Sequence, residues 1–314
     1  MPFPKKVDTK VAKGLLETLE GALDLLEDFK SSNRSTLPKD QSAVSLMEQC
    51  LALCEKQQIE KREPIRTVSH FACTGGTLVS KCIAAMPNIQ LLSEINPFST
   101  MHIARDKPSF APTDIIKQMR QSTRGVSDKL ISKLFLNNLE DIYTESSNNG
   151  QHLVLRDHAH SQFCTSTEIS ATPTLTDLVC SRFDTLSIVT VRHPVQSFIS
   201  VKQHKWLHFQ PANFDEYCRR YLAFLCAHDD APIFRYEDLV RDPIQTMRQI
   251  CESLQISFSD QFHLLFGAFK LTGDSGRGGE SIAPLENKEV DEQLAREVEG
   301  SQHYPILIER LDYC

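Results

Sequence analysis

Hydrophobic and polar positions divide the chain into two parts with different periodicity. Between residues 11 and 30 apolar side chains recur every three or four positions, and a second stripe of this kind covers 43–54. This spacing places apolar side chains on one face of a helix. A polar stretch (31–40) separates the two stripes. The pattern therefore predicts a helical hairpin over residues 1–63, which we interpret as a packing extension of the main domain.

After this extension, short apolar runs alternate with helical patterns. The predicted strands are Thr67–Ala72, Ile89–Ser93, His152–Arg156, Leu186–Val191 and Pro232–Phe234. The predicted helices are 76–86, 114–121, 126–144, 195–206, 213–227 and 242–254. Short apolar strands separated by helices are typical of an α/β fold with a mostly parallel, buried sheet. We expect this α/β domain to occupy residues 64–314.

The composition narrows the classes of function. Of the 314 residues 40% are hydrophobic and 24% charged, which is typical of a globular protein, and the net charge is −7. This balance gives no overall basic surface for a nucleic acid. No apolar run reaches the ~18 residues of a membrane span. The N-terminus lacks the apolar region of a signal peptide, and the ten cysteines form no CxxC pair, so we expect a cytoplasmic protein with reduced thiols.

A glycine-rich turn follows the first predicted strand and precedes a predicted helix. In Thr74-Gly75-Gly76-Thr77, the glycines allow consecutive backbone N–H groups to point at one anion, and the helix N-terminus adds its positive end. The segment lacks the Gly-Lys pair of a Walker A motif, which disfavours an ordinary ATPase, GTPase or nucleotide kinase. The simpler alternative is a plain glycine turn between a strand and a helix.

A second anion-binding pattern follows the fourth predicted strand. This strand ends at Arg192, and Pro194 opens a helix that carries Ser197 and Ser200 on one face. An arginine at the carboxyl end of a parallel strand and a serine on the next helix can hold a phosphate from two sides. The alternative is a surface arginine at a strand end.

Two later motifs complete a series of four. The segment RYEDL stands at 235–239, and GDSGRGG stands at 273–279. With the TGGT turn and the arginine that precedes a serine by eight residues, they resemble the sulfotransferase family that uses 3′-phosphoadenosine 5′-phosphosulfate (PAPS). The resemblance covers about Arg66 to Leu285. It implies a P-loop-like α/β fold and in-line transfer of a sulfuryl group, without a metal, to a hydroxyl or amine of a small-molecule or carbohydrate acceptor.

The resemblance also implies which residues bind the co-substrate. The turn would hold the 5′-phosphosulfate with Cys73, Thr74, Gly75, Gly76, Thr77 and Leu78. Arg192 and Ser200 would hold the 3′-phosphate, Tyr236 would lie near the adenosine, and Arg277 would close over the 3′-phosphate. Most members have lysine or arginine where this chain has Cys73. Arg156 and Lys81 are the candidates to replace that cation, and Arg156 is better placed, at the end of the third predicted strand.

Two candidates for the catalytic base remain. In the cytosolic branch of the family a basic residue, a spacer and a catalytic histidine stand in a row, which matches Arg156-Asp157-His158. In the tyrosylprotein branch the base is a glutamate 21 residues after the basic loop position, which falls on Glu94. The loop and helix (77–94) resemble that branch over a longer stretch and favour Glu94. A histidine is ready to accept a proton at neutral pH, whereas a glutamate needs burial to raise its pKa.

Several further possibilities stay open at this point. A nucleotide-binding regulatory protein on the same fold, without turnover, is the alternative function that Cys73 suggests. A zinc site at His158, His160 and Cys164 matches no common ligand spacing. The acceptor itself is not readable, but residues 97–126 and 206–213 are expected to line its pocket because loops at the carboxyl edge of a sheet carry specificity.

Overall fold

The computed structural model describes most of the predicted α/β domain. The described residues are 62–101, 103, 110–273, 281–284 and 286–313. The predicted helical hairpin lies outside them except for its last two residues, and Arg277 also lies outside them. The division of the chain at residue 63 therefore stays a prediction.

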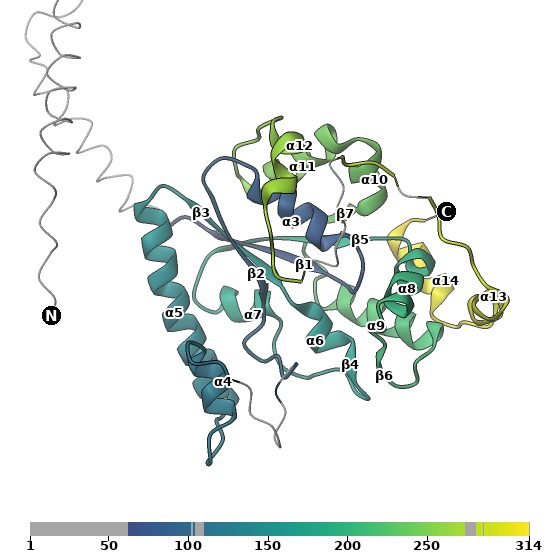
Figure 1. Cartoon of the computed structure of the whole chain (residues 1–314), viewed down its shortest axis with the longest axis horizontal. Helices are drawn as coiled ribbons and strands as arrows, with labels where there is room; N and C mark the ends of the chain where they lie inside the picture. The colour runs from purple at the N-terminus through teal and green to yellow at the C-terminus, as the bar shows by residue number, and fades with distance from the viewer. Residues whose placement is uncertain (1–61, 102, 104–109, 274–280, 285, 314) are drawn as a thin grey trace, which may run out of the picture. The chain divides into compact units, whose positions relative to one another are not determined.

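The central sheet confirms the predicted α/β class (Figure 1). Within the described residues it has five strands in the order β2-β3-β1-β5-β7, and every pairing is parallel. Their bounds are β1 Ile65–His70, β2 Ile89–Ile95, β3 His152–Asp157, β5 Thr185–Val191 and β7 Ile233–Arg235. All six residues of β1 are buried, as expected for the central strand of a sheet covered on both faces. A small second sheet pairs β4 Thr165–Ser166 with β6 His208–Phe209.

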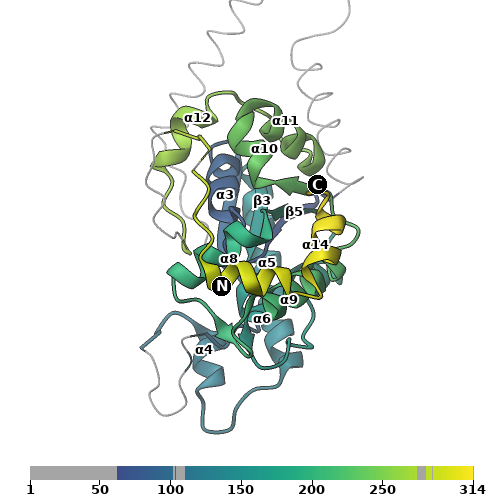
Figure 2. The same ribbon diagram turned by 90° about the vertical axis from the view of Figure 1, so that its right-hand side faces the viewer.

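Helices cover both faces of the central sheet (Figures 1 and 2). One face carries α3 Gly76–Ala84, α10 Tyr236–Arg241, α11 Pro243–Leu254, α12 Phe262–Leu265 and the 3₁₀ turn η1 Phe266–Ala268. Against the other face and the carboxyl end of the sheet lie α5 Asp128–Asn148, α6 Ala159–Phe163, α7 Leu175–Cys180, α8 Pro194–Gln203, α9 Phe214–Cys226, α13 Glu292–Glu299 and α14 Tyr304–Leu311. The short helix α4 is Ile115–Arg120. None of the described helices is at once long and apolar enough to span a membrane.

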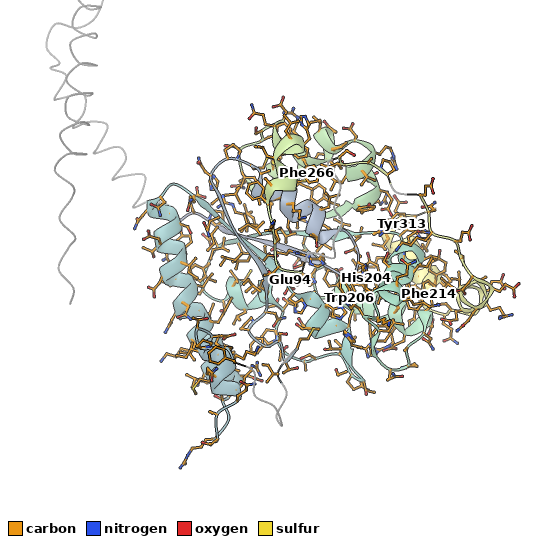
Figure 3. The ribbon with its side chains drawn as sticks, viewed as in Figure 1. Glu94, His204, Trp206, Phe214, Phe266 and Tyr313 are labelled. Atoms are coloured by element: carbon orange, nitrogen blue, oxygen red, sulfur yellow. The ribbon has the colours of Figure 1, made fainter. Side chains whose placement is uncertain are left out.

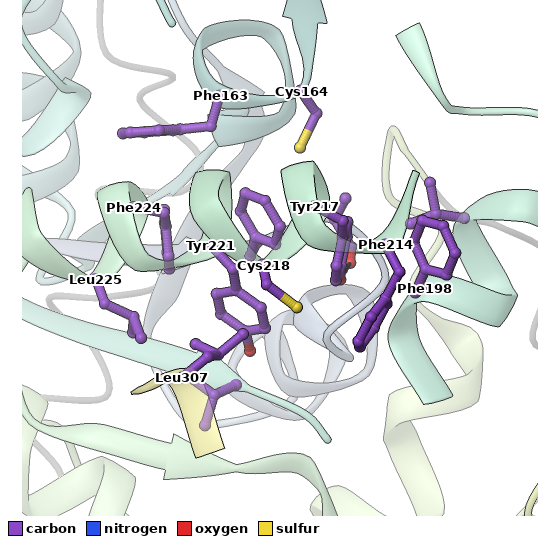
Figure 4. Packing of buried hydrophobic residues seen from close by; sticks show 14 of the residues in the cluster. Phe163, Cys164, Phe198, Phe214, Tyr217, Cys218, Tyr221, Phe224, Leu225 and Leu307 are labelled. Atoms are coloured by element: carbon purple, nitrogen blue, oxygen red, sulfur yellow. Dashed lines mark hydrogen bonds between the residues drawn. The ribbon is translucent and has the colours of Figure 1, made fainter. Parts of the chain in front are cut away.

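The aromatic face of α9 supports the end of β1 (Figure 4). The Phe71 ring stacks on Tyr221 with centroids 4.5 Å apart, and the Tyr217 hydroxyl donates to the carbonyl of Ala72 at 3.2 Å. Aromatic pairs of this kind add about 0.5–1.5 kcal/mol beyond the area that they bury. The turn after β1 therefore starts from a fixed point in the core, although the sequence pattern had extended this strand to Ala72.

Candidate active site

A single large cavity collects the predicted site residues at the carboxyl end of the sheet. Its volume is about 520 Å³. In Figure 3, Glu94 lies on one side of this region and His204 and Trp206 on the other. The predicted residues that line it are Cys73, Thr74, Gly75, Gly76, Thr77, Leu78, Lys81, Glu94, Arg156, His158, Arg192, Ser200 and Tyr236. The carboxyl edge of a parallel sheet is where such folds bind ligands, so the topology explains why these distant residues meet.

The glycine turn is shaped by what packs against it. Gly75 precedes α3 with φ 87°, in the left-handed region that favours glycine. A Cβ on Gly75 would also lie 2.5 Å from Cδ2 of the Tyr236 ring. Thr74 donates from its buried hydroxyl to the carbonyls of Phe71 (2.8 Å) and Thr190 (3.1 Å), which ties the turn to β5. The first backbone N–H groups of a helix have no partner within it, and Gly76 and Thr77 at the start of α3 both line the cavity.

Gly76 offers a sharp test of this packing. An added Cβ would lie 2.3 Å from Cγ of His70, and that ring is held in place by hydrogen bonds. We expect Gly76→Ala to displace the turn and to weaken the binding of adenosine 3′,5′-bisphosphate by at least about tenfold, since such overpacking costs roughly 1–3 kcal/mol. Isothermal titration measures this loss. Gly267→Ala is the matched control because nothing lies within 4 Å of its added Cβ, and equal effects of the two changes would contradict the assignment.

Arg156 forms the centre of a buried network. Its Nε donates to Nε2 of His70 at 3.0 Å, and Nη1 donates to the Ser93 hydroxyl and to the carbonyl of Thr272, each at 3.1 Å. Nη2 donates to the Thr77 hydroxyl at 2.9 Å and lies 2.7 Å from Oε1 of Glu94. These contacts use the five N–H donors of a guanidinium. Arg156 is only 2% exposed, so its charge enters the cavity from a fixed position.

The late segment that follows η1 reaches this network. The Thr272 hydroxyl donates to the carbonyl of Ser93 at 2.8 Å, and the Ser93 hydroxyl donates to the carbonyl of Thr272 at 3.1 Å. Thr77 donates to the carbonyl of Gly273 at 3.2 Å. A Cβ on Gly273 would lie 2.2 Å from Oε1 of Glu94, and its φ is 71°. Glycine at this position lets the backbone pass close to the carboxylate.

Glu94 and His158, the two candidate bases, lie side by side. Oε2 of Glu94 is 3.5 Å from Nε2 of His158, and Oε1 is 3.8 Å from Nε2 of His70. Burial would raise the pKa of the Glu94 carboxyl, but His70, Arg156 and His158 together lower it to about 2. Glu94 is therefore an ionised partner of neighbouring cationic and imidazole groups, and a weak acceptor of a proton by itself.

A cationic pair lies at the other end of the cavity and includes a residue that the sequence did not single out. Lys288 donates from Nζ to the Ser200 hydroxyl at 2.9 Å. The Gln196 side chain accepts a hydrogen bond from the backbone N–H of Lys288 at 2.9 Å and donates one to the Lys288 carbonyl at 3.2 Å. The guanidinium of Arg192 lies over the Tyr236 ring, 4.7 Å from its centre. Burial, together with the nearby charge of Arg192, lowers the pKa of Lys288.

Among the described residues, no carboxylate lies within ion-pair distance of Arg192 or Lys288. Two cations that face one cavity beside a serine hydroxyl favour a multiply charged anion. A lysine in a charged loop carries no motif, so only its polar neighbours on α8 could have indicated it. Arg277, to which the resemblance gave the late cationic role, lies outside the described residues.

Cys73 stands at the loop position where the resemblance implies a lysine or arginine. Its φ is 61°, and burial raises the pKa of its thiol to about 12 against the opposing pull of Arg192 and Lys288. The thiol is therefore uncharged at neutral pH. The two candidate replacements, Arg156 and Lys81, both line the cavity.

Imidazole and indole rings form the remaining wall. His160 lies 3.2 Å from His208 between ring nitrogens, and its ring is edge-on to Trp206. Burial, His158 and His208 lower the pKa of His160 to about 3, so that its ring is uncharged. The side chains weighed as zinc ligands do not converge, and within the described residues no group of three suits a metal ion.

The chain is similar to known proteins in a family model and among solved structures. A family model described as "Sulfotransferase family" matches residues 64–260. Among solved structures, a sulfotransferase domain from the curacin biosynthetic pathway aligns with 80% of this chain and 99% of its own, at 18% identity and TM-score 0.47. The sulfotransferase domain of the Synechococcus PCC 7002 olefin synthase aligns with 81% of this chain and 97% of its own, at 18% identity and TM-score 0.45. A mouse sulfotransferase complexed with PAP aligns with 79% of this chain and 89% of its own, at 12% identity and TM-score 0.39. A search of curated proteins found no match.

Proposed function

Because the chain belongs to the sulfotransferase family, we propose that it transfers the sulfuryl group of PAPS to a hydroxyl or amine of an acceptor. The observation that carries the proposal is the placement of two anion sites on one cavity. The glycine turn and the start of α3 line one side, and Arg192, Ser200 and Lys288 line another. PAPS carries charged groups at both its 5′ and 3′ positions, which this arrangement suits.

The turn and the cationic pair would divide the binding of PAPS between them. Backbone N–H groups of Gly75, Gly76 and Thr77 suit the 5′-phosphosulfate because the N-terminus of α3 adds its positive dipole end. Arg192 and Lys288 suit the 3′-phosphate, together with the Ser200 hydroxyl that accepts from Lys288. Tyr236, against which both Gly75 and Arg192 pack, would lie near the adenosine.

Chemistry would take place at the Glu94 end of the cavity. As the acceptor oxygen bonds to sulfur, the bond between sulfur and the 5′-phosphate oxygen breaks, and the acceptor loses its proton. We assign that proton to His158, because Glu94 is held ionised and can stabilise the imidazolium that forms. Arg156 supplies a fixed positive charge beside Thr77, where the leaving phosphate gains charge. Catalysis then consists of positioning and electrostatic stabilisation.

A ligand comparison tests the proposal. Adenosine 3′,5′-bisphosphate should raise the melting temperature more than ATP or GTP at equal concentration, since a ligand that binds only the folded state stabilises it. Release of adenosine 3′,5′-bisphosphate from PAPS in the presence of an acceptor panel then tests turnover. Stabilisation without any turnover would instead support the regulatory nucleotide-binding alternative.

The cationic pair yields a graded prediction. We expect Arg192→Ala and Lys288→Gln each to weaken adenosine 3′,5′-bisphosphate by roughly 10- to 100-fold, and Ser200→Ala only a few-fold, because charged hydrogen bonds contribute more than neutral ones. Isothermal titration measures all three. Lys202→Gln is the control, since Lys202 is on the same helix as Ser200 but pairs with Asp291 at 3.6 Å. Equal small losses of affinity in all four variants would contradict the assignment of the 3′-phosphate to Arg192 and Lys288.

A further inference from the structure

A second cavity adjoins the proposed reaction site. Its volume is about 300 Å³, at the small end of the range for small-molecule sites. Glu94 and Met101 line both this side cavity and the large one, so the two meet at the carboxylate beside His158. A molecule that reaches His158 with one group can therefore extend into the side cavity with the rest of its body. Apart from Glu94, the residues of this wall come from 95–101, 103 and 114–120 and from α5.

Two cationic and two acidic side chains line the side cavity. Lys117 and Arg120, both on α4, line it. Its two acids are already engaged: Glu94 pairs with Arg156, and Asp114 accepts the backbone N–H of Lys117 at 2.9 Å as the cap of α4. No carboxylate among the described residues is within ion-pair distance of either cation.

One buried donor of Arg120 has no hydrogen-bond partner among the described residues. Its Nη2 donates to the carbonyl of Pro97 at 3.0 Å, which fixes the guanidinium against the cavity wall. Its Nε is buried and has no hydrogen-bond partner in the part of the chain that the structure describes. Buried donors of a charged group ordinarily have a partner. A planar guanidinium held in this way matches an oxyanion that can accept two hydrogen bonds.

Most of the remaining wall is apolar, and Asn96 and Ser99 are its polar members. Ile95, Ile116 and Phe135 line the side cavity together with Met101. An acceptor that fits this space has an apolar body between its reacting hydroxyl and its charged end. A neutral sugar would leave the two cations without an anionic partner.

We propose that the acceptor is a hydroxylated compound with an apolar body and an oxyanion group, a carboxylate or a phosphate ester, and that Arg120 and Lys117 bind this oxyanion while the hydroxyl lies at His158. This inference rests on the proposed sulfotransferase function and names the class of its acceptor. It makes Arg120 a specificity-determining residue outside the chemistry itself.

The test uses the full chain with adenosine 3′,5′-bisphosphate bound. The probes are ω-hydroxyalkanoates of increasing length and 4-hydroxyphenyl alkanoates, each with its methyl ester, and the matching hydroxyalkyl monophosphates. We expect at least one chain length of acid or monophosphate to raise the melting temperature further, and its ester to do so at least about tenfold more weakly by concentration. The comparison of acids with monophosphates shows which oxyanion fits. With PAPS in place of the product, the same compounds should show the lowest KM as acceptors.

Arg120→Gln should remove the advantage of the acid over its ester and leave the binding of adenosine 3′,5′-bisphosphate unchanged. Lys117→Gln should also reduce the preference for the acid over its ester. This variant provides a second test if Arg120→Gln folds poorly. The exposed Arg124 is the matched control, since it is close in sequence but does not line the side cavity.

Three results would overturn the proposal: equal binding of acids and esters, equal effects of Arg120→Gln and Arg124→Gln, or no stabilisation by any oxyanion probe. If adenosine 3′,5′-bisphosphate itself failed to stabilise the wild-type chain, the sulfotransferase proposal would fail first and separately.

Discussion

His158→Ala is expected to lower kcat by about 10²–10⁴-fold, the usual contribution of a general base. Its Nε2 lies 3.5 Å from an ionised carboxylate oxygen of Glu94, so the imidazolium formed on proton uptake has a partner in place. Glu94→Gln should also lower kcat, but by less, because the glutamine side chain can still position the ring without neutralising its charge. Steady-state assays with a saturating acceptor measure both changes.

The pH dependence of kcat decides between the two bases. A base must be deprotonated to act, so kcat rises with pH through its pKa in the bound complex. With a pKa of about 2, Glu94 is ionised at every workable pH, and its action as base would give a flat profile. Histidine is the side chain that ordinarily titrates between pH 5 and 8, and a rising limb there indicates His158. A flat profile with inactive Glu94→Gln and active His158→Ala would make the carboxylate the base, as the tyrosylprotein-like loop suggests.

Arg156→Ala is expected to lower both turnover and stability by large factors. The change leaves the Glu94 carboxylate buried without its ion-pair partner, and breaking a buried pair on one side costs about 3–5 kcal/mol. We expect kcat to fall by about 10²–10³-fold and KM for PAPS to change less, since charge on the leaving phosphate develops mainly in the transition state. Denaturant unfolding and initial rates measure the two effects. Arg156→Lys should restore little, because an ammonium cannot reproduce five donors in a plane.

Arg66 provides the control for a merely structural effect. It is also a buried arginine of the central sheet, bonded to the carbonyls of Pro64, Leu254 and Gln255, but it does not line the cavity. Arg66→Ala should destabilise the fold and leave kcat of the folded fraction near that of the wild type. Similar losses of kcat in both variants would show that Arg156 acts through stability alone. If Lys81→Ala abolished turnover and Arg156→Ala did not, Lys81 would be the cation that compensates for Cys73.

Acid titration gives an independent check on the same ion pair. The folded-state pKa of Glu94 lies below the ordinary value near ~4.3, so its interactions stabilise the fold above that value, and this stabilisation is lost as pH falls toward 2. Arg156→Ala removes part of the cause of the lowered pKa. The variant should therefore lose less stability than the wild type between pH 5 and pH 2.

The sequence predicted the sheet and the glycine turn because both depend on local pattern. Apolar runs bounded by turn residues indicated β1, β3 and β5, and two glycines before a helix indicated the turn that lines the cavity. The end of β1 was misplaced by two residues, because Phe71 and Ala72 are apolar through their packing on α9 and not through strand pairing. Helices α13 and α14 were missed, since each has only eight residues and so shows only a short periodic pattern.

The site could be predicted only as far as single motifs reach. Glu94 and Arg156 each stood at a predicted strand end, but their pairing depends on β2 and β3 being neighbours, which no local pattern states. His70 gave a weak signal as a titratable residue inside a buried strand, and its role as acceptor from Arg156 emerged only from the fold. The position of Lys288 depends on two hydrogen bonds between its backbone and the Gln196 side chain, and these two residues are far apart in the chain.

The strand order also determines when this protein can begin to fold. Strand β1 pairs with β3 and β5, and β2 pairs only with β3, so the first two strands to be synthesised have no partner until β3 has been made. During that interval the backbone N–H and C=O groups of β1 have no neighbouring strand to pair with. Sheets built from such distant pairings fold slowly, because the entropy of closing long loops is lost before the contacts form. The network around Arg156 takes residues from β1, β2 and β3, so it cannot form before β3 has been synthesised.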